Sequence, residues 1–157
     1  MALCHTALNQ HDKAAEASIK ALHLHELTKQ KGHQDTLVHI LNAADSIDAS
    51  GKQDEAEKLY KEALGHAEAG KPSSNFQLAQ CNLEMAQFYK RHHKGDEAEH
   101  YFKKALVHYD HLNKKEKRSL YEVPLAYSHM LAELKRTEES DKLARKYLHV
   151  YCLLYTS

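Results

Sequence analysis

Histidine is the residue type in this sequence that most readily supports chemistry, because an imidazole binds metal ions and titrates near neutral pH. The chain holds 14 histidines. His108 and His111 are three residues apart and can share one face of a helix, whereas His23 and His25 are two apart and point to different sides. Neither pair belongs to an H-E-x-x-H pattern or has the cysteines that would complete a zinc site. We therefore expect surface histidines, no metal ion and no cofactor.

Acidic and nucleophilic side chains do not converge on a catalytic pattern either. The sequence has no glycine-rich phosphate loop and no nucleophile elbow. The acid pairs Asp54–Glu55 and Glu138–Glu139 stand where helices are expected to begin, and negative charge stabilises the positive end of a helix dipole there. The prediction is a protein without catalytic residues, and not an enzyme.

The elements that carry these residues are set by a twelve-residue segment that occurs four times at a constant spacing of 42 residues. Its copies are HDKAAEASIKAL from His11, QDEAEKLYKEAL from Gln53, GDEAEHYFKKAL from Gly95 and TEESDKLARKYL from Thr137. Equivalent positions hold Ala14, Ala56, Ala98 and Ser140, and seven residues later Ala21, Ala63, Ala105 and Tyr147. A fixed period of this length indicates an array of one structural unit. Such arrays build extended binding surfaces more often than active sites.

Each unit is predicted to contain two helices joined by a short turn. Apolar residues within 37–47 follow a helical stripe that ends before Gly51, a natural C-terminal stop. The second helix is expected to begin near Asp54. A loop with Gly, Pro and Ser comes next, and Ser74 or Asn75 is expected to cap the following helix.

The last unit is expected to begin near Tyr121. Ser119 and Glu122 have the spacing of a capping box, and Pro124 requires the helix after them to start late or bend. We therefore divide the single array over 1–157 into a partial first repeat, two full repeats and a degenerate last repeat. The proposed bounds are 1–36, 37–78, 79–120 and 121–157.

The composition is typical of a helical protein and bears on which classes of partner the chain could bind. The chain has 42% hydrophobic residues, 22 basic against 22 acidic side chains, 5 Gly and 2 Pro. A net charge of zero favours neither nucleic acid nor a membrane surface. The start lacks the features of a secretory signal, and the cysteines at 4, 81 and 152 are few and scattered, so we expect a cytoplasmic protein with reduced thiols.

The small and aromatic residues of the repeats resemble those of the tetratricopeptide (TPR) repeat. They are Ala44, Gly51, Ala56, Tyr60 and Ala63 in one unit and Ala86, Tyr89, Ala98, Phe102 and Ala105 in the next. The 42-residue period is similar to that of the kinesin light chain subclass. The resemblance implies an all-α, right-handed superhelical solenoid of antiparallel helix pairs, with about seven or eight helices. It also implies a concave groove, lined by the first helix of each pair, that binds a peptide segment of another protein.

Repeat register assigns the side chains that this groove is expected to present. They are Asn42, Asp45 and Asp48, then Glu84, Gln87, Lys90 and Arg91, then His129 and Glu133. Family members that hold a C-terminal carboxylate place a lysine where this sequence has Leu41, Leu83 and Leu125, so we expect no carboxylate clamp. The prediction is a mixed-charge surface with a line of leucines at its base, suited to a peptide with apolar anchors.

Other interpretations of the same residues stay open. The charged residues of the groove could be a solvated helical face without a ligand. Apolar ends suggest self-association or a fragment of a larger array, with exposed residues among 3–22 and a very apolar stretch over 147–155. The final CLLYTS resembles translated adapter sequence. A metal site built on histidines is a more remote alternative.

Overall fold

The structure is a computed structural model that describes residues 17, 20, 34–70 and 74–155, with the side chains of 34–36 and 148–155 left out. Helices account for nearly all of the described residues, and no strand occurs among them. The helices are α2 (Gln34–Ala49), α3 (Gln53–Ala69), α4 (Asn75–Arg91), α5 (Gly95–Asp110), α6 (Lys114–Ser119), α7 (Glu122–Glu133) and α8 (Thr137–Tyr155). The prediction of an all-α fold with seven or eight helices is confirmed.

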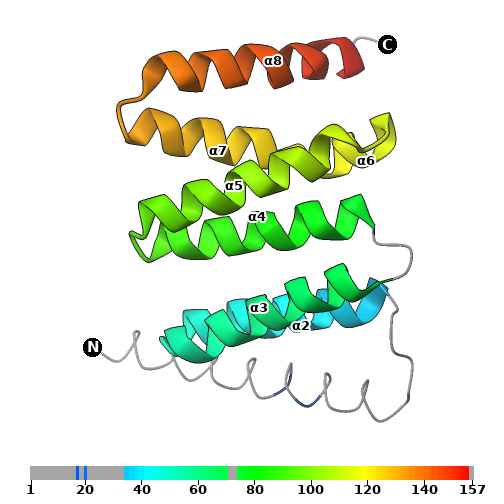
Figure 1. The fold of residues 1–157 in the computed structure, drawn as a ribbon, viewed down its shortest axis with the longest axis vertical. Coiled ribbons are helices and arrows are strands. Elements are labelled where there is room, and N and C mark those ends of the chain that lie inside the picture. Colours follow the sequence, from blue (N-terminus) through cyan, green and yellow to red (C-terminus); the bar gives the residue numbers. More distant parts are fainter. Residues whose placement is uncertain (1–16, 18–19, 21–33, 71–73, 156–157) are drawn as a thin grey trace.

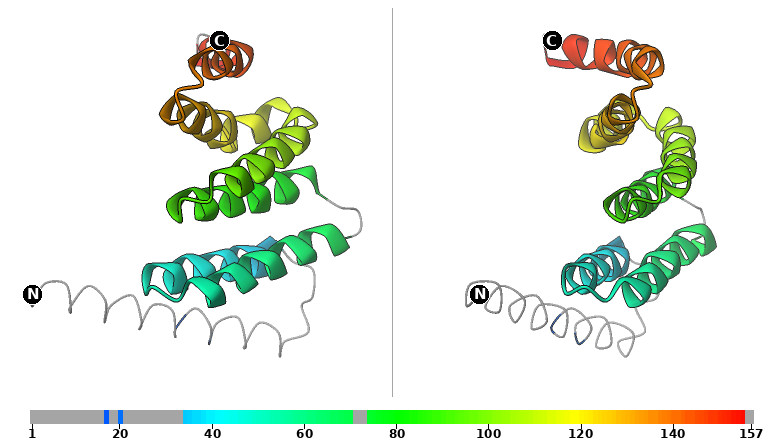
Figure 2. Two further views of the ribbon diagram at one scale, coloured as in Figure 1. Left: turned by 60° about the vertical axis from the view of Figure 1, so that its left-hand side comes forward. Right: turned by 90° about the vertical axis from the view of Figure 1, so that its left-hand side faces the viewer.

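The helices pack in successive pairs that stack along one direction. Contacts join α2 to α3, α4 to α5 and α7 to α8 within the pairs, and α4 touches both α2 and α7. Figure 1 shows the pairs lying one above another from α2 to α8, and the right-hand view of Figure 2 shows α2, α4 and α7 along one side. None of the described helices is long and apolar enough to span a membrane.

One turn geometry joins the helices of each pair. The described residues with positive φ are Gly51, His93 and Lys135, at +84°, +58° and +60°, and they are spaced by 42 residues. The next residue in each turn donates its backbone N–H to a carbonyl five residues back, as Lys94 does to Tyr89 at 2.9 Å. This is the Schellman ending of a helix, in which the residue after the helix adopts the left-handed conformation. Only the first of the three turns uses the glycine that this conformation favours.

The core consists of the small and aromatic residues that define the repeat. Ten residues of the expected set lie in the described region, and all are buried except Gly51, which forms a turn: Ala44, Ala56, Tyr60, Ala63, Ala86, Tyr89, Ala98, Phe102 and Ala105. Aromatic rings pack against one another between helices, as Tyr60 and Phe88 do with tilted rings and centroids 5.1 Å apart. Ala14 and Ala21 lie outside the described residues.

Serines replace alanines in the last pair without leaving a polar group unsatisfied. Ser140 occupies the position of Ala56 and Ala98, and Ser128 that of Ala86. Both serines are buried, and the Ser140 hydroxyl donates to the Ser128 carbonyl at 2.8 Å. The two hydroxyl oxygens are also within hydrogen-bonding distance of each other, at 3.0 Å. The degenerate repeat therefore keeps the close helix approach by satisfying each serine with the other.

Helix ends confirm one expected cap and correct another. Ser74 caps α4, because its side chain accepts from the Gln77 backbone N–H. The capping box predicted at Ser119 and Glu122 is wrong, since Ser119 is the last residue of α6. The actual box is one element earlier, where the Asn113 side chain and Glu116 satisfy each other's backbone N–H groups at 3.0 Å. Pro124 lies in the first turn of α7, where a helix needs no N–H from it.

Candidate functional site: the face of helices α2, α4 and α7

The residues predicted for the groove come from the first helix of each pair. We call them the A-helix face: Asn42, Asp45 and Asp48 of α2, Glu84, Gln87, Lys90 and Arg91 of α4, and His129 and Glu133 of α7. Spacings of three or four residues on each helix keep them to one side.

Arg91 connects α4 to α2. Its Nε donates to Asp48 Oδ2 at 3.0 Å, and its Nη2 reaches Asp45 Oδ1 at 3.4 Å and the Tyr60 hydroxyl at 3.1 Å. The Tyr60 hydroxyl in turn donates to Asp45. Burial, with the hydrogen bond to Asp45, raises the pKa of Tyr60, so its hydroxyl keeps its proton. Through this network, the Arg91 guanidinium joins two neighbouring repeats.

His92 adds a second contact to the same carboxylate and was not among the predicted site residues. Its Nε2 is 2.6 Å from Asp48 Oδ1, and its ring packs on Phe88 with centroids 4.7 Å apart. The Asp48 side chain is only 8% exposed. Asp48 is thus enclosed by the Arg91 guanidinium and the His92 ring and offers little to a ligand.

A hollow opens between α4 and α7. The Lys90 Nζ donates to Glu133 Oε1 at 2.9 Å across it. Its volume is about 540 Å³, and its lining includes five residues of the A-helix face: Gln87, Lys90, Arg91, His129 and Glu133. His93, Phe102 and Ala126 complete the lining. Side chains from three helices, distant in sequence, therefore surround one open space.

Four side chains of the A-helix face make no hydrogen bond or ion pair with another residue of the described region: Asn42, Glu84, Gln87 and His129. Asn42 is exposed, and its backbone carbonyl accepts from the Ser46 hydroxyl at 2.9 Å. Glu84 and Gln87 are half-buried, one turn apart on α4. These side chains hold the hydrogen-bonding capacity of the face that the fold does not use.

The expected line of leucines at the base of the groove is corrected by the structure. Leu41 and Leu83 are 4% and 2% exposed, so they belong to the core between helices. Leu125 is half-buried. Each leucine comes just before a face position, and one residue turns a helix by about 100°, which is enough to move a side chain from the surface into the core. Apolar lining in the hollow comes from Phe102 and Ala126 instead.

Among known proteins, only solved structures match this chain, and they match it by fold. No family model matches the sequence, and no curated protein matches it. The fold matches BtubC from P. vanneervenii with a TM-score of 0.71 at 18% identity, covering 94% of this chain and 56% of that one. It also matches a kinesin light chain with nearly identical TPR-like repeats from Podosopora anserina, with a TM-score of 0.71 at 15% identity, covering 92% and 68%. The fold is a TPR-like repeat array.

The TPR-like array therefore spans little more than half the length of BtubC. A point variant of the Podosopora anserina protein gives the same TM-score of 0.71 at 14% identity. At these identities the likeness concerns the fold alone.

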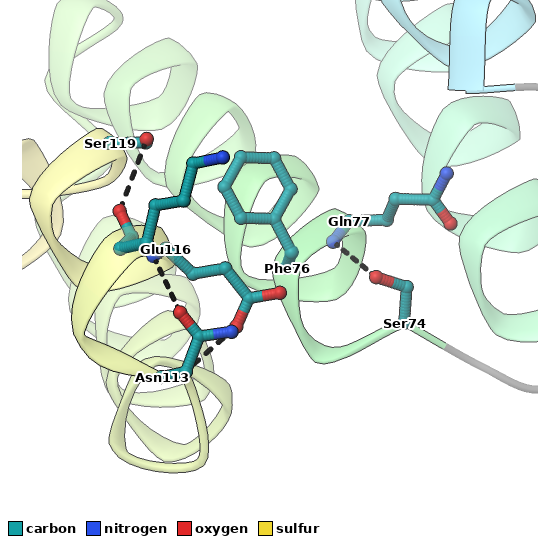
Figure 3. A pocket seen from close by; sticks show the side chains of 7 residues that line it. Ser74, Phe76, Gln77, Asn113, Glu116 and Ser119 are labelled. Carbon is teal, nitrogen blue, oxygen red and sulfur yellow. Dashed lines mark hydrogen bonds between the residues drawn. The ribbon is translucent and has the colours of Figure 1, made fainter.

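The array has a second, larger hollow at the other end of the helices, near the start of α4 and at α6 (Figure 3). Its volume is about 650 Å³, and its lining is Ser74, Phe76, Gln77, Asn113, Lys115, Glu116 and Ser119. Most of these polar groups already hold helix ends, including Ser74 at Gln77 and Asn113 at Glu116. The Ser119 hydroxyl donates to the Lys115 carbonyl at 3.3 Å. We therefore place the candidate site at the A-helix face.

The histidine pair considered for metal binding, His108 and His111, lies at the C-terminal end of α5. His108 Nδ1 lies 3.0 Å from Asn75 Oδ1, and burial, reinforced by His111, lowers the pKa of His108. Within the described ranges, no group of three or more His, Cys, Asp or Glu side chains is arranged to hold a metal ion. His23, His25 and the apolar residues of the N-terminal segment lie outside the described residues, as do the side chains of the apolar C-terminal stretch after Tyr147.

Proposed function

We propose that this TPR-like array is a non-catalytic scaffold that binds a segment of another protein along the A-helix face. The observation that carries the proposal is the hollow of about 540 Å³ between α4 and α7, which five of the nine residues predicted from repeat register line. Repeat arrays bind partners on such extended surfaces, because successive units present equivalent side chains at regular intervals.

The unused side chains of the face support a peptide rather than a compact small molecule. Asn42, Gln87 and His129 belong to three successive units. An extended backbone offers N–H and C=O groups repeatedly along its length, and amide side chains can donate and accept at once. A segment that follows the stack could therefore meet a hydrogen-bonding side chain in each unit.

Selection of displayed random peptides on the purified chain tests the proposal. The comparison variant is Gln87→Ala with His129→Ala, which removes two side chains that have no partner in the described region. The matched control is Lys58→Ala with His100→Ala, two exposed positions on α3 and α5. Circular dichroism and melting curves verify that all three proteins fold equally well.

The expected result is a common peptide motif that the native chain and the control enrich and the comparison variant does not. Enrichment by all three proteins alike would place binding elsewhere on the molecule. No enrichment by a folded native chain would overturn the proposal and favour self-association. Sedimentation of the native chain over a range of concentrations would then measure that alternative.

A further inference from the structure

Among the described residues, Glu84 is the carboxylate of the A-helix face that has no ion pair. It lies in the middle of α4 and is half-buried. Repeat register places it between Asn42 of α2 and Ala126 of α7. The side chain forms neither a hydrogen bond nor an ion pair with another part of the described chain. Such a carboxylate is exposed enough to contact a ligand. Its partial burial makes an unpaired negative charge unfavourable, so a bound cation would stabilise it.

Both permanent cations of the face are already engaged. Lys90 pairs with Glu133 at 2.9 Å, and Arg91 pairs with Asp48 at 3.0 Å and with Asp45 at 3.4 Å. Releasing either cation for Glu84 would break a contact between repeats. The charge that remains unneutralised on this face is therefore negative, which favours a cationic partner.

The groups that act on Glu84 come from its own helix and from both neighbouring first helices. The pKa of Glu84 is raised to about 7, mainly by burial and also by repulsion from Asp45 and Glu122, while Arg91 opposes these effects. The carboxyl is thus partly protonated at neutral pH when the face is empty. A cation that docks against it would favour the ionised form and displace the proton.

We propose that Glu84 receives a lysine or arginine side chain of the bound segment, so that the A-helix face selects peptides with a basic residue. This inference rests on the proposed function of the face. Asn42, the register equivalent of Glu84 on α2, and Gln87, one turn later on α4, have no side-chain partner among the described residues and would hold the peptide backbone near Glu84. The preferred partner is then a basic, extended segment, and acidic segments are disfavoured by Glu84, Asp45 and Glu122.

The test repeats the peptide selection on Glu84→Gln, which keeps the shape of the side chain and removes its charge. Glu68→Gln, at an exposed position of α3, is the matched control. One enriched peptide and its Lys→Gln or Arg→Gln analogue are then titrated by calorimetry into each protein. At pH 7, titrations in buffers of different ionisation enthalpy count the protons released, and about half a proton per peptide is expected from a pKa near 7.

We expect a basic residue at a fixed place in the motif that the native chain enriches. Glu84→Gln should lower the affinity for that peptide about tenfold, because it removes the attraction between the carboxylate and the basic side chain. The analogue peptide should bind the native chain and Glu84→Gln equally. A motif without a basic residue that still depends on Gln87 and His129 would overturn this inference and leave the scaffold proposal intact. Absence of any enriched motif would count against both.

Discussion

The Arg136 guanidinium holds both carboxylate oxygens of Glu99, with Nη1–Oε2 at 2.6 Å and Nη2–Oε1 at 3.2 Å. The equivalent pair one unit earlier is Lys94 and Glu57, at 3.9 Å. Each pair joins the second helix of one unit to the turn of the next. Glu99 also pairs with Lys103 one turn later in its own helix, at 2.8 Å. The same carboxylate therefore also holds two units together.

Replacing Glu99 should weaken the array in a pH-dependent way. The Arg136 guanidinium, with Lys103, lowers the pKa of Glu99 to about 2 from an ordinary value of 4.5. Because the unfolded chain binds this proton more readily, the stabilisation is complete above about pH 4.5 and is lost as pH falls towards 2. Glu99→Gln should lower the free energy of unfolding by about 1–2 kcal/mol at neutral pH. It should also make that free energy fall less steeply as the pH decreases below 4.5. Urea melts at several pH values measure this, with Glu68→Gln as the control; parallel acid limbs would contradict it.

Glycine at position 135 should stabilise the last helix pair. Lys135 adopts φ +60° in the turn position that Gly51 occupies in the 37–78 repeat. A non-glycine residue in this conformation is strained, so Lys135→Gly should gain roughly 0.5–1 kcal/mol. Lys142→Gly, within α8, should instead lose about as much, since glycine weakens a helix interior. Thermal melts of the two variants should move in opposite directions.

Removing the buried amide of Asn82 should also raise stability. Its Nδ2 donates to the Leu78 carbonyl at 2.7 Å, but its Oδ1 is buried without a partner among the described residues. The equivalent residue one unit earlier is the buried Ile40. Asn82→Leu should gain about 1 kcal/mol, while Asn82→Asp should lose more than about 2 kcal/mol by burying a charge. A loss with leucine would show that the oxygen is satisfied in solution.

Small residues at the helix contacts should tolerate enlargement poorly. Ala56 and Ala98 are 0% exposed, so Ala56→Leu or Ala98→Leu should cost roughly 1–3 kcal/mol by overpacking. Asn42→Ala, at an exposed position, should stay within about 0.5 kcal/mol of the native chain and weaken ligand binding. Chemical unfolding provides the ranking, and the reverse order would contradict the assignment of the core.

Glu84 should give stability the opposite pH dependence from Glu99. Its folded-state pKa of about 7 exceeds the ordinary value of 4.5, so the folded chain binds more protons between these values. Stability from the protonated carboxyl is complete below about pH 4.5 and declines as pH rises through 7. Glu84→Gln should therefore become more stable than the native chain by up to about 2 kcal/mol at alkaline pH. Equal melting temperatures at pH 8 would refute this.

The helical array could be predicted because its determinants are local and repeated. A constant spacing of 42 residues aligns the alanines and aromatic residues, and their burial follows from one helix contact copied along the chain. Helix caps were less certain, because Ser119–Glu122 and Asn113–Glu116 both have the spacing of a capping box. In the structure α6 begins after Asn113 and ends at Ser119, so the Asn113–Glu116 box is the one that forms.

The connections across the A-helix face could not be predicted in the same way. Arg91 and Asp48 are 43 residues apart, and their contact depends on how far successive helix pairs rotate relative to each other. Register identifies polar residues on one side of a helix, but it does not distinguish a side chain that binds its neighbour, such as Lys90, from one that stays available, such as Gln87. The signal for His92 was its position next to Arg91, one residue further round the same helix end.

The contacts between units have a mechanical consequence. Asp48–Arg91, Lys90–Glu133 and Glu99–Arg136 each connect one unit to the following one. Stiffness in such a stack is set at the junctions, while the interior of each helix pair stays rigid. Small rotations at successive junctions add up, so the two ends of the face move more than any single junction does. The array should therefore be able to change its superhelical twist and its length. A bound segment that spans several units would restrict this change.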